Sequence, residues 1–335
     1  MKLKSISEQV VVVFGASSGI GRETALRFAR RGAILVVSAR GEEGLNSLVE
    51  EIQQCGGRAT AIPAEVTDFA QVQAVADAAV REYGRIDTWV HVAAVTIYAT
   101  FEETTPEEFR RIVEVNLLGQ VHGAQAALPA LRRAGGGALI AVSSVEAMRP
   151  LPYNSAYAAS KHGLHGFLQT LRMELRHDDT PIQVTEIMPA SINTPLFNKA
   201  RTKLGVKPMG IPPVYPPSLV ADAILYAAEH PVREIVVGGA GKMMLMNQRI
   251  SPRLTDALME RIGFKGQRTD EPRSATAPDN LFAPLPGYDK VEGDFSGQAK
   301  VTGMLERNPA VKVAVASLAL GTLALLLSRS RQAKN

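Results

Sequence analysis

Cysteine is almost absent from this sequence, because Cys55 is the only one among 335 residues. A single thiol cannot form a disulfide within the chain, so the fold has to rest on a hydrophobic core. Apolar residues make up 46% of the chain, which is ample for one large domain or two ordinary ones. Since a chain of this kind suits a reducing compartment, we expect a cytoplasmic protein.

The sequence also lacks the clustered positive charge of a nucleic-acid-binding protein. Its formal net charge is +4, but residues 1–239 contain 23 Lys and Arg against 24 Asp and Glu. The basic excess lies in residues 240–335, with 14 basic and 9 acidic side chains. We therefore expect no nucleic-acid partner. None of the six histidines has metal-ligand spacing with another ligand, and we predict no metal.

No signal peptide is expected, because the apolar run in MKLKSISEQVVVVFG is short and leads directly into a glycine motif. Beyond it, strand-like apolar runs alternate with helical patterns. The predicted strands are 10–14, 34–38, 58–63, 86–92, 138–143, 182–188 and 234–237. Helices are predicted between them, including 42–54, 68–83, 106–133 and 217–229. This alternation predicts an α/β, doubly wound (Rossmann-type) parallel sheet, forming a dinucleotide-binding catalytic domain over residues 1–240.

The composition changes after residue 240, so a C-terminal extension is predicted. Residues 241–264 are interpreted as one or two helices, and residues 265–308, rich in Pro, Gly and charge, as a flexible linker. Residues 309–335 are predicted to form an apolar tail helix with a basic end.

The apolar part of the tail, VAVASLALGTLALLL at 313–327, is marginal as a membrane anchor. As a helix it would span about 22 Å, or about 27 Å from residue 310, against a hydrocarbon core of roughly 30 Å. Flanking basic residues favour contact with an anionic bilayer through residues 310–331. The alternative is a helix packed in a groove of another subunit.

The first predicted strand runs into the turn GASSGIG and then into a helix. Glycines here permit a tight turn and let backbone amides and the positive end of a helix approach a pyrophosphate. A purely structural turn is the alternative. We predict that this turn contacts a dinucleotide through Gly15, Ser17, Ser18, Gly19, Ile20 and Gly21.

Two charged residues follow the next predicted strands. Arg40 stands where enzymes that use NAD place a carboxylate, and an arginine can pair with a 2′-phosphate. With Arg22 nearby in sequence, it favours NADP over NAD, although a solvated surface arginine is the alternative. Glu65 is a candidate for binding the adenine amino group, or simply a charge at a helix start.

The stretch YNSAYAASKHG places Tyr157 and Lys161 on one face of a predicted helix. Asn154 or Ser155 is the expected N-cap, and leucines at helical spacing follow as a buried stripe. A nearby ammonium favours phenolate, so we expect Lys161 to lower the pKa of Tyr157. The spacing alone also occurs on ordinary solvated helices.

In combination these motifs resemble the short-chain dehydrogenase/reductase family over roughly residues 8–240. The resemblance rests on the G-x-x-x-G-x-G turn, Asn116 in VNLLG, Ser144 thirteen residues before Tyr157, and Lys161 four residues after it. It extends to PASINT at 189–194, because members of this branch commonly have a Pro-Gly followed by a threonine after the sixth strand. The resemblance implies a seven-stranded parallel sheet, a nicotinamide dinucleotide and a homodimer or homotetramer.

The resemblance also implies roles for single residues. Ser144 would stabilise the oxyanion, Tyr157 would deliver the proton, Lys161 would hold the nicotinamide ribose, and Asn116 would position a water. Further cofactor contacts are expected from Val66, Ala93, Ile192 and Thr194. Candidates for the pocket wall are Glu146, Arg149 and Tyr153, and residues 195–217 are expected to form a lid.

Three segments depart from the family pattern. Asn-Asn-Ala-Gly is replaced by HVAA at 91–94, Pro-Gly by Pro189-Ala190, and the threonine that often opens the glycine motif by Phe14. These changes concern cofactor contacts more than chemistry, and His91 is interpreted as a packed strand residue.

The leading hypothesis is an NADP-dependent oxidoreductase that interconverts a secondary alcohol and a ketone, with an apolar substrate if the tail meets a membrane. The alternative is a dinucleotide-binding sensor or scaffold without turnover. The departures at HVAA and Pro189-Ala190 favour the sensor, and the complete set of four catalytic candidates favours the enzyme.

Overall fold

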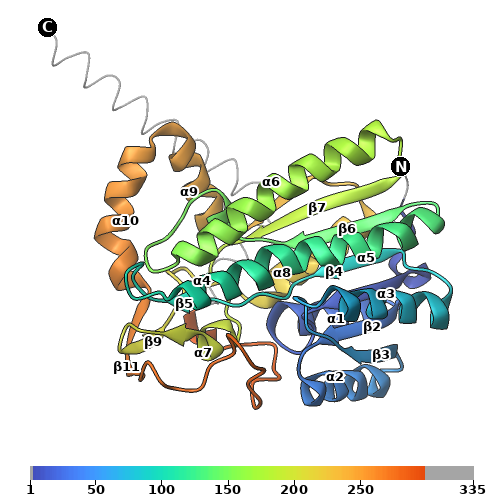
Figure 1. The fold of residues 1–335 in the computed structure, drawn as a ribbon, viewed down its shortest axis with the longest axis horizontal. Coiled ribbons are helices and arrows are strands. Elements are labelled where there is room, and N and C mark those ends of the chain that lie inside the picture. Colours follow the sequence, from blue (N-terminus) through green and yellow to red (C-terminus); the bar gives the residue numbers. More distant parts are fainter. Residues whose placement is uncertain (1–2, 299–335) are drawn as a thin grey trace, which may run out of the picture.

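The computed structural model describes residues 3–298, and its central element is a seven-stranded parallel sheet (Figure 1). The strand order is β10-β7-β6-β4-β1-β2-β3. The strands are β1 (Val10–Phe14), β2 (Ile34–Ala39), β3 (Arg58–Pro63), β4 (Thr88–His91), β6 (Gly137–Val142), β7 (Ile182–Pro189) and β10 (Glu234–Val237). The doubly wound sheet and its seven strands are therefore confirmed, and the order reverses between β1 and β4.

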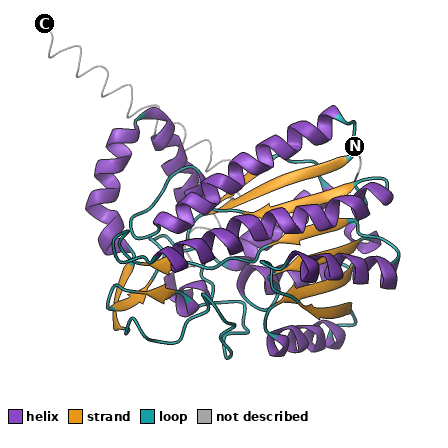
Figure 2. Cartoon of the chain, viewed as in Figure 1, coloured by secondary structure: helices purple, strands orange, loops and turns teal. Residues whose placement is uncertain are grey.

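Helices cover both faces of the sheet (Figure 2). One hydrophobic cluster lies under α3 (Phe69–Tyr83), α5 (Gly119–Arg133) and α6 (Ser155–His177). The other lies under α1 (Gly19–Arg30), α2 (Glu42–Gln54) and α8 (Pro217–Glu229). Each sheet face is thus buried, which explains why the strands read as continuous apolar runs.

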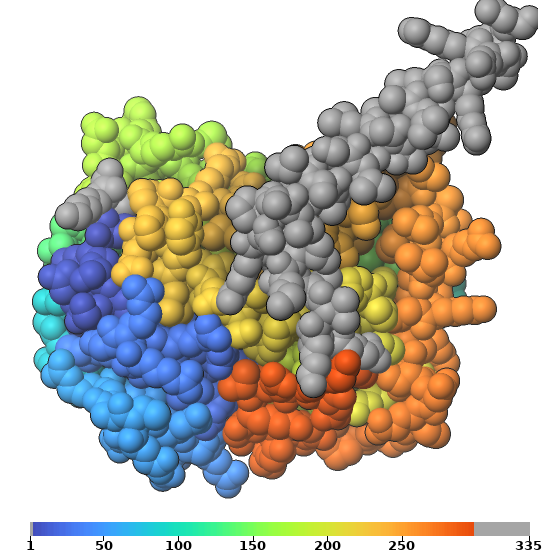
Figure 3. Space-filling view, turned by 180° about the vertical axis from the view of Figure 1, so that it is seen from behind, coloured from blue at the N-terminus to red at the C-terminus, as the bar shows by residue number. Residues whose placement is uncertain are grey.

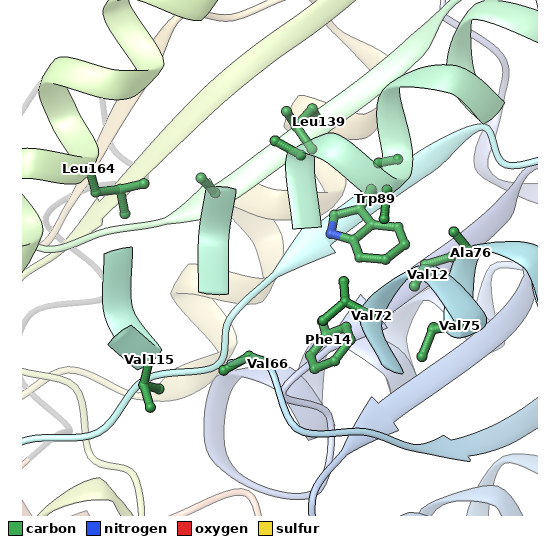
Figure 4. Close-up of a cluster of buried hydrophobic side chains, with 14 of the residues drawn as sticks. Val12, Phe14, Val66, Val72, Val75, Ala76, Trp89, Val115, Leu139 and Leu164 are labelled. Atoms are coloured by element: carbon green, nitrogen blue, oxygen red, sulfur yellow. The ribbon is translucent and has the colours of Figure 1, made fainter. Parts of the chain in front are cut away.

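Strand β1 supplies both clusters because successive side chains of a strand point to opposite faces. Val12 and Phe14 join the first cluster, and Val11 and Val13 join the second. Figure 4 shows Trp89 of β4 beside Phe14, and their ring centroids are 6.1 Å apart. This packing fixes the carboxyl end of β1, where the glycine turn begins.

The helical stretches predicted near 106–133 form three consecutive elements. Helix α4 (Pro106–Val113) is followed by a single turn of π-helix (Glu114–Leu118) and then by α5. Thr105 and Glu108 form a capping box at the start of α4. The π-turn is an inserted bulge of a kind often found at functional sites, and it contains Asn116.

Helix α6 has the predicted form. Asn154 is its N-cap residue, and the leucine stripe is buried at Leu164, Leu168, Leu171 and Leu175. Short elements lie between α6 and the end of the sheet: α7 (Leu196–Lys199), β8 (Arg201–Thr202), which pairs with β5 (Ile97–Tyr98), and β9 (Val206–Pro208).

The extension begins with a helical hairpin, α9 (Gly239–Ile250) and α10 (Pro252–Gly266). The predicted linker differs from the structure over its described part, 265–298. Strand β11 (Arg268–Pro272) pairs antiparallel with β9, and Leu281 is completely buried in the first hydrophobic cluster. A Pro-rich segment can pack against a domain when a single apolar residue anchors it. Composition does not show which apolar residue will be buried.

Among the described residues, no helix has the length and apolar character needed to cross a membrane. The predicted tail, 309–335, lies outside the described residues.

Candidate functional site

A cavity of about 500 Å³ opens at the carboxyl ends of the strands, beside the reversal between β1 and β4. This is where ligands bind in open parallel sheets. Its walls include most of the predicted site residues, namely Gly15, Ser17, Ser18, Gly19, Ile20, Arg40, Glu65, Val66, Ala93, Ser144, Tyr157, Lys161, Ile192 and Thr194. Chain segments that are far apart in sequence therefore meet at one site.

The glycine turn connects β1 to α1 and lies against the loop after β4. A side chain at Gly15 would put its Cβ 2.5 Å from the backbone nitrogen of Ala93, and one at Gly21 would lie 2.0 Å from the carbonyl oxygen of Gly15. Both glycines are therefore needed for close packing. Gly21 does not line the cavity, so its predicted cofactor contact is replaced by a packing role.

Arg40 extends into the cavity from the end of β2. One of its terminal nitrogens donates to the carbonyl oxygen of Asn280 at 2.7 Å, and the other has no hydrogen-bond partner and lies 3.8 Å from Glu65. Glu65 accepts a 2.6 Å bond from Arg111, so two guanidinium groups share one carboxylate. The net positive charge suits a phosphate.

Arg22 does not contribute to this charge at the cavity. Its guanidinium bonds to Glu51, Ser47 and the carbonyl oxygen of Gly44, and it joins α1 to α2. It is not among the lining residues. The expectation that it acts beside Arg40 is wrong, because α1 carries its side chain away from the cavity toward α2.

Ser144, Tyr157 and Lys161 meet at the other end of the cavity. Ser144 follows β6, and its hydroxyl interacts with the phenol of Tyr157. The ammonium of Lys161 lies 5.5 Å from the centre of the Tyr157 ring and donates to the carbonyl oxygen of Val142 at 3.1 Å. Ser144 and Lys161 thus approach the same phenol from two elements, the end of β6 and helix α6.

The pKa of Tyr157 shifts in the direction opposite to the prediction. Burial raises it well above its ordinary value of 10, and the Glu146 carboxyl raises it further. Burial also lowers the pKa of Lys161 to about 8, although Glu186 and Glu146 oppose this. Desolvation is the largest cause of both shifts. Tyr157 is accordingly a protonated phenol at neutral pH.

Asn116 is completely buried behind the cavity wall. Its side chain exchanges two 2.9 Å hydrogen bonds with the backbone of Val95 and donates to Ser160 at 3.3 Å. Ser160 precedes Lys161, so Asn116 ties the loop after β4 to α6. Its own amide does not line the cavity.

The predicted pocket-wall residues divide into two groups. Glu146 lines the cavity, and burial raises the pKa of its carboxyl to about 8. Tyr153 and Arg149 do not line it. Tyr153 packs edge-on against Phe264 of α10, and Arg149 bonds to Asp256 and Gln248, so both attach the helical hairpin to the domain.

His91 is a packed strand residue, as expected. It is buried and stacked on Phe14, with ring centroids 5.3 Å apart. Burial lowers its pKa to about 3, so the ring is neutral.

Several lining residues were missed by sequence reasoning. Lys199 at the end of α7 belongs to the predicted lid but was not singled out. The others belong to the extension: Asn280, Pro284, Leu285, Pro286 and Asp289. No local motif distinguishes them, because their position depends on how the extension folds back over the domain.

Residues 9–205 match the family described as short chain dehydrogenase. The chain belongs to the short-chain dehydrogenase family. Among its relatives, this dehydrogenase is 39% identical over 284 residues to the uncharacterized oxidoreductase YxnA of Bacillus subtilis, covering 84% of this chain and 80% of the relative. It is also 38% identical over 208 residues to dehydrogenase/reductase SDR family member 7B of Bos taurus, covering 60% of this chain and 63% of the relative.

Two solved structures are similar to this short-chain dehydrogenase. An alcohol dehydrogenase from the archaeon Thermococcus sibiricus, complexed with 5-hydroxy-NADP, is 26% identical with a TM-score of 0.60, covering 68% of this chain and 95% of that one. A short-chain type dehydrogenase/reductase from Mycobacterium marinum is 28% identical with a TM-score of 0.62, covering 71% and 96%. The family assignment makes the protein an NAD(P)-dependent oxidoreductase.

The cavity of this dehydrogenase fits a nicotinamide dinucleotide on structural grounds. Gly15 and Gly19 line the cavity beside the N-terminus of α1, where the helix dipole favours phosphate. Arg40 keeps one nitrogen without a hydrogen-bond partner at the end of β2, where a ribose 2′ group is usually read.

Proposed function

We propose that this protein is an NADP-dependent oxidoreductase that interconverts a secondary alcohol and a ketone, with Tyr157 as the acid and base. One observation carries the proposal: Ser144, Tyr157 and Lys161 line the same cavity as the glycine turn and Arg40. The three catalytic candidates therefore lie at one end of the cavity. The cation proposed to recognise the 2′-phosphate, Arg40, lies at the other end.

In the reducing direction, a nicotinamide cofactor, when bound, would provide the hydride for the carbonyl carbon. Ser144 donates a hydrogen bond to the carbonyl oxygen, and Tyr157 gives its phenolic proton to the same oxygen. The raised pKa of Tyr157 keeps that proton in place until charge develops on the substrate. Lys161, held by the Val142 carbonyl, then stabilises the phenolate.

The test is Tyr157→Phe, assayed with NADPH against a panel of aliphatic and aromatic ketones. We expect turnover to fall by on the order of 10²- to 10⁴-fold, because the ring is kept and only the proton donor is lost. Tyr153→Phe is the matched control, since that ring packs on Phe264 outside the cavity, and we expect it to retain activity. Unchanged turnover in Tyr157→Phe would exclude the assigned role. Absence of turnover by the unmutated protein on every ketone would favour the sensor.

We also propose that the protein contacts an anionic membrane through residues 310–331 and the hairpin α9–α10. Several hairpin side chains are large, apolar and exposed: Met243, Met246, Ile250, Leu254, Leu258, Ile262 and Phe264. Between them stand exposed basic residues, including Arg249, Arg253 and Arg261. An exposed apolar face bordered by basic side chains is typical of helices that lie at a membrane surface.

The homodimer or homotetramer implied by the family resemblance remains a proposal. Met173 of α6 is 57% exposed, and small residues precede it on this helix. Pairing of two copies along α6 would cover this side chain.

A further inference from the structure

The extension crosses the cofactor end of the cavity as a segment that we call the roof, residues 279–296. In Figure 3 the orange-red residues of the extension lie against the blue N-terminal part of the surface. The roof carbonyl oxygens of Asn280 and Leu281 accept from Arg40 at 2.7 Å and from Arg111 at 3.0 Å. The roof is thus bonded to the residues that surround the predicted 2′-phosphate position.

The roof also reaches the glycine turn. The backbone nitrogen of Gly19 donates to the carbonyl oxygen of Lys290 at 2.9 Å. Asp289 lies over α2, because a Cβ at Gly44 would be 2.2 Å from its carboxylate oxygen. Leu281 anchors the segment in the hydrophobic core of the domain, where its side chain is completely buried.

The roof covers the cavity and does not fill it. Five roof residues line the same cavity of about 500 Å³ as the glycine turn and the end of β2. Space is therefore enclosed between the roof and the domain, and a ligand in that space would be covered on its outer side.

Lys199 adds a cation to this enclosed space. It is the last residue of α7, and its ammonium donates to the hydroxyl of Ser18 in the glycine turn at 2.8 Å. The roof holds Lys199 in place, because the backbone nitrogen of Asn280 donates to its carbonyl oxygen at 3.0 Å. Burial lowers the pKa of Lys199 to about 8, and Asp289 of the roof opposes this shift.

An ammonium bonded to the glycine turn lies where a phosphate is expected. The N-terminus of α1 attracts anions to this turn, where the Gly19 amide donates to the Lys290 carbonyl of the roof, and lysine binds phosphate as a point charge. The carboxylate of Asp289 opposes the lowering of the Lys199 pKa. A phosphate bound to Lys199 would act in the same direction.

We propose that Lys199 binds a phosphate of the dinucleotide and that the roof closes over the bound cofactor. Cofactor affinity then depends on a residue outside the family motifs, and cofactor release depends on opening the roof. This inference rests on the proposed use of NADP, but it concerns binding and release rather than turnover.

The first test is Lys199→Met, with NADPH binding measured by the fluorescence of the reduced nicotinamide. We expect the Kd to rise about tenfold or more, and its dependence on salt concentration to weaken, because one phosphate contact is lost. Lys203→Met is the matched control. Lys203 belongs to the same loop but bonds to Glu108 and does not line the cavity. A Kd within twofold of the unmutated protein, or equal changes in both variants, would overturn the assignment of Lys199.

The second test is Leu281→Ala, with NADPH release followed after rapid mixing with excess NADP. Removing the anchor loosens the roof, so we expect release to accelerate fivefold or more. Phe282→Ala is the control, because the neighbouring side chain is 49% exposed and outside the cavity. Gly44→Ala gives a second route that leaves the hydrophobic core intact, since its Cβ would lie 2.2 Å from a carboxylate oxygen of Asp289, closer than the 3.0 Å to the Cβ of Ser17, so we expect Asp289 to shift.

The outcomes separate this inference from the proposed function. Unchanged release in both roof variants, or tighter binding when the roof is loosened, would overturn the roof as a cover while leaving the NADP-dependent activity in place. If the unmutated protein binds neither NADPH nor NADH, both proposals are wrong.

Discussion

Lys161 is a cation enclosed by the wall of its own active site. Burial lowers its pKa to about 8 in the folded protein, whereas the unfolded chain keeps a value near 10.5. Between these two values the unfolded state binds more protons than the folded state, so stability rises with pH. At neutral pH, burial of the charged Lys161 therefore lowers the free energy of unfolding of the protein without cofactor.

This leads to a stability prediction for Lys161→Met. The free energy of unfolding of the unmutated protein, relative to this variant, is expected to increase by about 1–3 kcal/mol from pH 8 to pH 10. Urea unfolding of the cofactor-free proteins at both pH values measures it. Lys199 has a similar shift but is present in both proteins, so its effect cancels. A difference that does not change with pH would contradict the burial of a charged Lys161.

Arg40 is the second residue whose charge is decisive. Its nitrogen that makes no hydrogen bond, 3.8 Å from Glu65, and the nearby Arg111 make the end of β2 favourable for a 2′-phosphate. Arg40→Asp is expected to reverse the ratio of NADPH to NADH affinity, by on the order of tenfold or more, because the carboxylate repels phosphate and accepts from a ribose hydroxyl.

Separate titrations with the two cofactors measure that ratio. Arg133→Asp provides the control for overall charge, since that side chain is exposed on α5, outside the cavity. An unchanged ratio in Arg40→Asp would refute the assigned role.

At the scale of elements, the sequence was informative wherever a local pattern dictates the outcome. The strands of the sheet are continuous apolar runs, and the Asn154 cap and leucine stripe of α6 are set by helical periodicity. The π-turn at Asn116 could not be predicted, because its residues continue the helical pattern on both sides and nothing in the sequence marks the inserted bulge. The function of that turn is to carry a buried amide to the backbone of Val95.

The candidate site likewise contains residues that local sequence patterns predict and residues that they do not. The offsets between Ser144, Tyr157 and Lys161 identified residues that do share one cavity. The pKa of Tyr157 was predicted in the wrong direction, because burial outweighs the neighbouring cation and is not visible in sequence. Lys199 and the roof were missed, since their contacts join residues separated by up to 271 positions, from Gly19 to Lys290.

At the scale of the molecule, the hairpin α9–α10 is the part of the described chain that presents the most exposed apolar surface. Five of its exposed side chains are Met243, Met246, Ile250, Leu254 and Leu258. If the hairpin and the tail act together at a membrane, binding requires both the apolar face and anionic lipid.

Sedimentation with phosphatidylglycerol vesicles tests this expectation. We expect the full chain to bind these vesicles several times more strongly than vesicles of phosphatidylcholine alone. Deletion of residues 301–335 should remove most of the binding, and Leu254→Ser with Leu258→Ser should weaken it further. Equal binding by the full chain and the deletion variant would exclude the tail, and a change of molecular mass without vesicle binding would indicate association between copies.

The distance along the chain between the glycine turn and the roof also bears on the order in which the protein is made. The ribosome adds the turn and Arg40 long before Asn280, which lies 240 positions after Arg40, whereas strand β10 at the edge of the sheet ends 43 positions before it. Because N-terminal parts fold first during synthesis, we expect that a dinucleotide can meet the glycine turn on the growing polypeptide before the roof covers it. Loading at that stage bypasses the cover that every later exchange has to open, so the first cofactor enters by a faster route than any that replaces it.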